Sequence, residues 1–544
     1  MLFSYNIIDL SHPLLILLSF SFILYAETHY RITFLPSRYY KKEPEIIADV
    51  PHRIQPNSML PVLLIIKDAD KFPVQLFRLT ITATKNNKTK ALFSYFFHNS
   101  VINNRYWQHV YFCHPPEDFA GNAEINVIVD YKCNHSIKKC INDNYTLSSH
   151  KPFTVYLDDH TLPCMPDWYF GDLHVHTNYT DDQVEFGAPL ESTAKMAVAM
   201  GLNFFAATDH SYDLDDEPDN YLKNDPDLQK WKSLWDASAR HNKNSNMVII
   251  PGEEVSAGNT GNRNVHLLLL NNKTFYRGDG DSAEKWMHTK PNQPIQSILE
   301  NLESNAVAIA AHPTNPPPLL QWLLVRRGNW QSSDYAQPNL AGVEVWNGNK
   351  KDFFKHGLPR WIELLLAGHR LCLLAGNDAH GNFNRFRQIG MPHFSMQEHK
   401  DEVFGTVRTG LFIKGTLCLD NILLALNKHH AIVTDGPFLS MELRHPSKSF
   451  FIGESCPYSE GELVMKVKSS PAFGRIKKLM LTIGDCYTKK EARRNLNHPS
   501  GSIKIDFSEY ISGLPSQGYV RVHTVTEKEG KEFHAFTNPI YLSH

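Results

Sequence analysis

Short alternations of hydrophobic and polar residues occur toward both ends of the chain. Between about residues 45 and 165 the apolar runs are brief, and clusters of Asn, Lys, Pro and Gly separate them. The same pattern returns after Gly436 and Pro437. Short strands at this spacing are typical of antiparallel sandwiches. We therefore predict small β-sandwich-like modules over residues 45–165 and 438–544.

The central part, residues 166–437, has a different pattern. Residues 189–200 have helical spacing and end before Gly201, a residue type that commonly terminates helices. An apolar stretch at residues 202–208 follows and predicts a strand. Strands and helices alternate over most of this part, which favours an α/β fold with a parallel sheet that closes into a barrel.

Histidines and carboxylates stand at most of the predicted strand ends in this central part. His174 and His176 are two residues apart in one predicted strand, so both imidazoles face the same side and can bind one metal. The carboxyl ends of parallel barrel strands meet at one mouth, where such side chains would converge. One histidine at a strand end is usually no ligand, but nine matched positions favour a multinuclear metal site. The candidate ligands are His174, His176, Asp181, His210, Glu254, His266, His312, Asp378 and His380.

Five segments resemble motifs of the PHP superfamily of metallohydrolases. GNDAHGNFNRF, FGTVRTGLF and ALNKHHAIVTDGPFL are most similar to its CehA/McbA branch, which includes carbamate ester hydrolases. The resemblance covers about residues 168–440 and implies a distorted (β/α)7 barrel. The five segments are DLHVHTNYTDD (172–182), TDHS (208–211), PGEEVS (251–256), AHP (311–313) and GNDAH (376–380).

The resemblance also implies how the ligands divide among two or three metals. Glu254, rather than Glu253, would bridge two of them, because the family pattern is Gly-x-Glu. The ligands implied for the first metal are His174, His176, Glu254 and Asp378. Those implied for the second are Glu254, His266 and His312, and those implied for a third are Asp181, His210 and His380.

Imidazole and carboxylate ligands without thiolate suit divalent Zn, Mn or Fe. Metals bridged by one carboxylate can share a hydroxide that attacks the substrate, which predicts a metal-dependent hydrolase. The cations exceed the carboxylates in charge, so a phosphoester is the favoured small-molecule substrate. Arg385 and Arg387 are candidates for clamping phosphate oxygens. Asp209 is a candidate for orienting His210 or carrying a proton.

Two alternatives stay open. The same metal site suits a carboxyl or carbamate ester hydrolase, which is what the branch resemblance implies. A protein of a different class, a non-catalytic surface or carbohydrate-binding protein, would owe its function to the flanking β modules. Oligomeric state is left open.

Composition and the first residues add limits on partners and compartment. The 544 residues carry 55 Lys and Arg against 57 Asp and Glu, a net charge of −2, so no general nucleic-acid binding is expected. Residues 1–26 contain an apolar run at 13–25 that suits a signal peptide or anchor and is short for a bilayer span. This predicts export to the periplasm, cell surface or medium, with a cytoplasmic location as the alternative, and no further membrane span.

Overall fold

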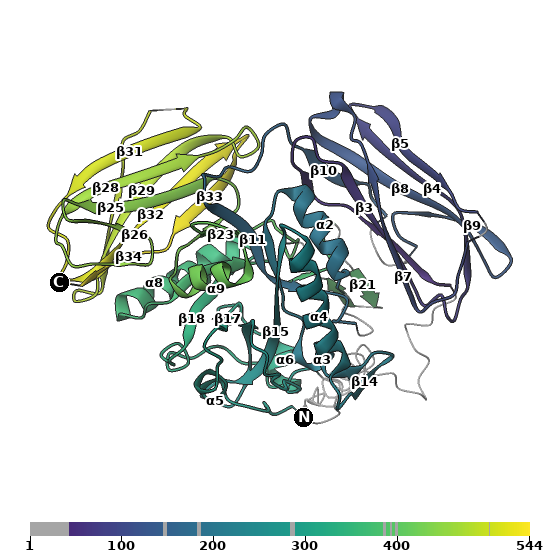
Figure 1. The fold of residues 1–544 in the computed structure, drawn as a ribbon, viewed down its shortest axis with the longest axis horizontal. Helices are drawn as coiled ribbons and strands as arrows, with labels where there is room; N and C mark the ends of the chain where they lie inside the picture. Colours follow the sequence, from purple (N-terminus) through teal and green to yellow (C-terminus); the bar gives the residue numbers. More distant parts are fainter. Residues whose placement is uncertain are drawn as a thin grey trace, which may run out of the picture.

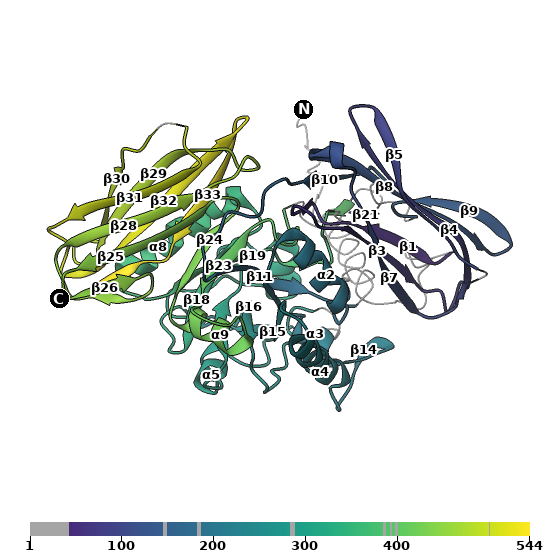
Figure 2. The ribbon, with the colours of Figure 1, turned by 45° about the horizontal axis from the view of Figure 1, so that its top comes forward.

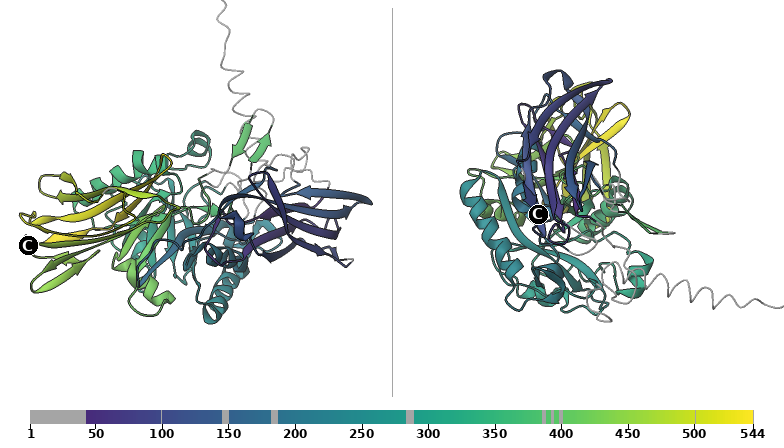
Figure 3. Two further views of the ribbon diagram at one scale, coloured as in Figure 1. Left: turned by 90° about the horizontal axis from the view of Figure 1, so that it is seen from above. Right: turned by 90° about the vertical axis from the view of Figure 1, so that its right-hand side faces the viewer.

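The computed structural model describes residues 43–98, 100–144, 150–181, 187–282, 289–384, 388–391, 394–397, 401–499 and 501–543. The predicted signal or anchor segment, residues 1–26, lies outside the described residues. Two β modules lie at opposite ends of a central part that carries most of the helices (Figures 1, 2 and 3). Among the described residues, no helix is both long and apolar enough to cross a bilayer.

The N-terminal module consists of two sheets around a shared apolar core. One sheet has the order β1-β3-β7, and the other has β2-β10-β8-β4-β5 as its main path. Alternate residues of β4 and β8 are buried, as expected for strands with one face on a core. The elements are β1 (Glu45–Asp49), β2 (Arg53–Ile54), β3 (Leu60–Lys67), β4 (Val74–Lys85), β5 (Lys88–Phe96), β6 (Val101–Ile102), β7 (Tyr106–Cys113), η1 (Glu117–Phe119), β8 (Gly121–Cys133), β9 (Ser136–Ile141) and β10 (Phe153–Leu157).

The central part is built on a large mixed sheet. Its main path runs β19-β18-β17-β16-β15-β12-β11-β23-β24 and then continues into strands of the C-terminal module. The strands of this part are β11 (Trp168–His176), β12 (Phe204–Ala207), β13 (Asp216–Glu217), β14 (Asn220–Asn224), β15 (Val248–Gly258), β16 (Asn264–Leu270), β17 (Val307–Ala310), β18 (Leu340–Asn347), β19 (Cys372–Gly376), β20 (Ala379–His380), β21 (Gln388–Met391), β22 (Phe394–Gln397), β23 (Arg408–Phe412) and β24 (Ala431–Thr434).

The helices of the central part are fewer and shorter than a βα repeat requires. Helix α2 ends at Gly201, whose φ of 86° is left-handed, which confirms the predicted stop. The helices are α2 (Leu190–Met200), α3 (Ser211–Leu214), α4 (Gln229–Asn244), α5 (Ile295–Glu300), α6 (Leu319–Leu324), α7 (Lys350–Asp352), η2 (Phe353–Gly357), α8 (Leu358–Ala367) and α9 (Leu419–Asn427).

The predicted distorted (β/α)7 barrel is wrong. Strand β16 is antiparallel to both β15 and β17, and β23 is antiparallel to both β11 and β24. Only residues 259–263 connect β15 to β16, and so short a connection produces a hairpin rather than a parallel crossover. At its other side the sheet continues from β24 into β33 of the C-terminal module.

The C-terminal module packs a second sheet, β26-β25-β28-β31, against the end of the large sheet. Buried residues of both sheets, among them Leu443, Leu463 and Val520, belong to one apolar cluster. The strands are β25 (Phe438–His445), β26 (Lys448–Phe451), β27 (Ser455–Cys456), β28 (Gly461–Lys468), β29 (Arg475–Asp485), β30 (Lys490–Asn495), β31 (Lys504–Ile511), β32 (Gln517–Lys528), β33 (Lys531–Thr537) and β34 (Ile540–Ser543).

A buried amide connects the C-terminal module to the central sheet. The side-chain oxygen of Asn538 accepts a hydrogen bond from the backbone N–H of Leu373 in β19 (2.6 Å). Its Nδ2 donates to the carbonyl oxygens of Leu373 and of Ala431 in β24, each at 3.0 Å. Asn538 is fully buried, so these backbone groups have no access to water.

We expect the substitution Asn538→Leu to lower the free energy of unfolding by about 2–4 kcal/mol, because it leaves buried backbone groups without partners. The matched control is Asn495→Ala, which removes an exposed amide from β30. This substitution should change the free energy of unfolding by less than about 0.5 kcal/mol. Urea denaturation measures both. Equal stabilities for the two variants would contradict this role of Asn538.

Candidate metal centre

The end of β11 places two imidazoles side by side. His174 and His176 are fully buried, and their Nε2 atoms lie 3.3 Å apart, as the alternation along a strand predicts. Close approach of β19 requires glycine at position 376, because a Cβ there would lie 2.6 Å from the Cβ of His174. The strand end is therefore packed tightly against the loop that carries Asp378.

The carboxylate of Glu254, near the middle of β15, lies at the centre of the cluster. Its Oε2 is 3.0 Å from His210 Nδ1, 3.3 Å from His174 Nε2 and 3.4 Å from His176 Nε2. Its Oε1 contacts His266 Nδ1 and lies 3.0 Å from His312 Nε2. The two oxygens thus face different sets of imidazoles.

Asp378 completes the first group of donors. Its Oδ1 lies 3.0 Å from His176 Nε2 and 3.4 Å from His174 Nε2. Asp378 and His312 both have positive φ, 50° and 27°, an unfavourable conformation for residues with a side chain. Such strained positions are concentrated at functional sites.

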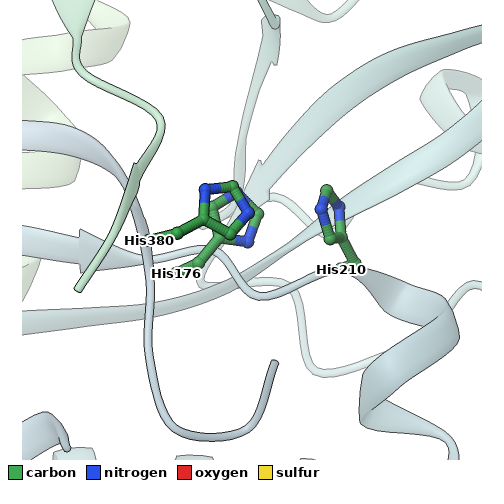
Figure 4. Close-up of side chains that lie close together, drawn as sticks. All are labelled: His176, His210 and His380. Atoms are coloured by element: carbon green, nitrogen blue, oxygen red, sulfur yellow. The ribbon is translucent and has the colours of Figure 1, made fainter. Parts of the chain in front are cut away.

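A third group consists of imidazoles alone. The rings of His176 and His380 are stacked with centroids 4.0 Å apart, and His210 lies across from them (Figure 4). The His176 and His210 centroids are 4.3 Å apart. His380 Nδ1 is 3.0 Å from the carbonyl oxygen of Asp378, so Nε2 is the nitrogen with which His380 would bind a metal.

Two carboxylates lie behind the imidazoles and determine which nitrogen faces inward. Glu344 Oε2 is 2.9 Å from His174 Nδ1, and Asp281 Oδ2 is 3.2 Å from His266 Nε2. The Glu344 carboxylate holds a proton on His174 Nδ1, so the lone pair of His174 Nε2 points at Glu254. His266 also contacts Arg327, whose Nη2 lies 3.1 Å from His266 Nδ1. This carboxylate–histidine arrangement is characteristic of metal sites in proteins.

The spacing of the donor atoms fits divalent metals. Donors bound tetrahedrally at about 2.1 Å would lie about 3.4 Å apart, and the contacts within the first group are 3.0–3.4 Å. In this part of the molecule, three groups of described side chains have donor atoms that all lie within 4.8 Å of one another. They are His174, His176, Glu254 and Asp378; His210, Glu254 and His266; and His176, His210 and His380.

Burial and neighbouring charges act in opposite directions on the pKa values of Glu254 and His174. Burial acts to raise the pKa of Glu254, but the neighbouring imidazoles His266, His174 and His210 outweigh it and hold that pKa well below its usual value. Burial acts to lower the pKa of His174, but Glu344, Asp378 and Glu254 outweigh it and raise that pKa well above its usual value. These carboxylates attract positive charge, which a divalent cation supplies as well as protons do.

Two buried aspartates hold the loops of the cluster in place. Asp209 accepts hydrogen bonds from the Thr177 hydroxyl (2.8 Å) and from the Thr180 N–H (3.0 Å). Asp172 accepts from Asn377 Nδ2 (2.7 Å) and connects β11 to the residue before Asp378. Burial raises the pKa of Asp172 to about 7.

The structure brings eight of the nine predicted ligands together and places one elsewhere. Within the described residues Asp181 is in none of the donor groups and pairs with Lys67 Nζ and Arg105 Nη2 of the N-terminal module, each at 3.3 Å. Arg385 and Arg387 lie outside the described residues. The eight ligands brought together are His174, His176, His210, Glu254, His266, His312, Asp378 and His380.

Sequence reasoning missed the outer carboxylates. Glu344 lies in an otherwise apolar strand, and a carboxylate inside such a strand is a signal that was available. Asp281 follows β16 in a loop, and nothing in its spacing indicates His266 as a partner. Arg327 pairs with Asp281 and was also missed.

Comparisons with known proteins do not assign the chain to a family. No protein-family model matches it, and no curated protein does. Among solved structures, a glycosyl hydrolase family 2 member from Bacteroides cellulosilyticus is 10% identical with a TM-score of 0.17, covering 92% of this chain and 63% of its own. The β-glucuronidase of Parabacteroides merdae is 9% identical with a TM-score of 0.18, covering 92% and 65%. The chain spans less than two thirds of the length of either protein.

We expect Glu254→Gln to abolish stoichiometric binding of Zn or Mn, because it removes the negative charge of the carboxylate that lies between the two sets of imidazoles. The matched control is Glu253→Gln, since the Glu253 carboxylate contacts the Ser211 hydroxyl (2.9 Å) and the Tyr276 N–H (3.1 Å) instead of the cluster. Elemental analysis after dialysis measures bound metal. Equal metal content in the two variants would contradict a central position for Glu254.

Removing the charge behind His174 should weaken metal binding without abolishing it. We expect Glu344→Gln to lower the affinity for Zn by about 10–100-fold, because the proton on His174 Nδ1 is held less firmly. Competition with a chromophoric chelator measures the affinity. The control Glu363→Gln, on the exposed side of α8, should leave the affinity for Zn unchanged. An equal loss of affinity in this control would contradict a specific role of Glu344.

Proposed function

We propose that this protein is a metal-dependent hydrolase of phosphoesters whose cations are held around Glu254. The observation that carries the proposal is the position of the two Glu254 oxygens between separate sets of imidazoles, which suits a carboxylate that bridges two cations. Bound in this way, cations lower the pKa of water and polarise the bond under attack.

The arrangement of the side chains supports this proposal in two further ways. His174, His176 and Glu254 are shielded from solvent, whereas the side chain of Asp378 is 18% exposed, so water and substrate have access from the Asp378 side. Glu344 and Asp281 orient the imidazoles of His174 and His266 before any substrate arrives.

The charge of the cluster favours an anionic substrate. Glu254 and Asp378 are the inner carboxylates, and two divalent cations would exceed them in charge. Arg327, beside His266, is already paired with Asp281. An excess of positive charge stabilises the charge that develops on a phosphoryl group. The resemblance of the motifs to those of the PHP superfamily supports the same ligand chemistry, although the chain does not form the closed barrel.

Chelation followed by reloading with Mn or Zn, and assay against p-nitrophenyl phosphate, bis-p-nitrophenyl phosphate and p-nitrophenyl acetate, tests the proposal. We expect metal-dependent turnover of a phosphate ester and at least about a hundredfold loss of kcat/KM in Glu254→Gln, a larger effect than removing an outer carboxylate. Glu253→Gln should retain activity. Turnover of p-nitrophenyl acetate alone would change the proposed substrate class from phosphoesters to carboxyl esters. Absence of turnover of all three substrates with either metal would contradict the proposal of a hydrolase.

A further inference from the structure

Helix α6 presents three large apolar side chains to solvent on one face. Leu319 is 71% exposed, Trp322 42% and Leu323 53%. Their spacing of three and four residues places them on the same side of the helix, and we call them the α6 surface. A group of adjacent exposed apolar side chains marks an interaction site more often than single exposed apolar residues do.

Basic side chains border the α6 surface. The Arg263 guanidinium lies 4.5 Å from the centre of the Trp322 ring and donates a hydrogen bond to the Trp322 carbonyl oxygen (3.2 Å). Arg326, two residues after the helix, donates to the Asn262 carbonyl oxygen (3.3 Å). Within the described ranges the contacts of these two arginines are with the Trp322 ring and with backbone carbonyl oxygens, not with a carboxylate. The surface is therefore apolar with an uncompensated positive border.

The α6 surface is fixed close to the metal-ligand cluster. The backbone N–H of Asn264, at the start of β16, donates to the Arg326 carbonyl oxygen (3.0 Å), and its Nδ2 donates to that of Val325 (2.8 Å). His266 follows two residues later on the same strand. In Figure 1 the helix lies in the lower part of the central region, away from the two β modules.

We propose that the α6 surface docks the protein onto a bilayer that contains anionic phospholipid. Leucine and tryptophan side chains enter the boundary between headgroups and acyl chains, while arginines contact lipid phosphates. Three side chains cover far less than the roughly 800 Å² per partner of a standard protein interface, which disfavours a protein as the occupant. This docking does not depend on metal binding.

Co-sedimentation of the full chain with lipid vesicles tests this docking. The probes are vesicles of phosphatidylcholine alone and vesicles with about 30% phosphatidylserine. We expect wild-type protein to bind the anionic vesicles, and the double variant Leu319→Ser, Leu323→Ser to bind them at least about tenfold more weakly. The variant Arg263→Gln, Arg326→Gln should lose the preference for anionic over neutral vesicles.

The matched control is Leu424→Ser on α9, where the leucine is 50% exposed on a different helix. It should bind as the wild type does. All variants keep the apolar run at residues 13–25, so any membrane affinity of that run cancels from the comparison. The proposal is overturned if wild-type protein ignores both kinds of vesicle, or if the double variant and the control bind equally. Concentration-dependent self-association that the double variant abolishes would assign the surface to a second copy of the chain instead.

Discussion

Buried along β15, the two oxygens of the Glu254 carboxylate lie between imidazoles that come from β11, β16 and the loops after β12 and β17. A lone buried carboxylate is costly, and so is a set of crowded imidazoles. Together they compensate each other, and under the proposed function a divalent cation would supply the remaining positive charge. The strands around this carboxylate, which backbone pairing holds together, place its imidazole partners on both sides of it.

The mixed sheet fulfils this requirement without being a barrel. The hairpin of β15 and β16 places Glu254 and His266 on adjacent strands, and parallel pairing of β11 with β12 brings His174 close to His210. The outer carboxylates Glu344 and Asp281 then hold the imidazoles in one orientation. Rigid elements, rather than one closed architecture, are sufficient to build a site of this kind.

How far the sequence alone predicted this structure differs between the local and the global level. The end of α2 at Gly201 and the shared face of His174 and His176 follow from local rules, and both are present in the structure. The barrel was wrong because the periodicity of apolar strands is the same whether they pair parallel or antiparallel, and the turn at residues 259–263 reverses the direction of β16 relative to β15. Glu344 and Asp281 depend on contacts between distant segments, which spacing along the chain does not reveal.

An anomalous-scattering map from crystals grown with Mn or Zn tests the central claim most directly. The account predicts peaks within bonding distance of Glu254, one near His174 and His176 and another near His266. A map with its peaks only at Asp158, Asp159 and His160, a separate group of possible donors, would contradict it, as would a map in which Glu254 touches no metal.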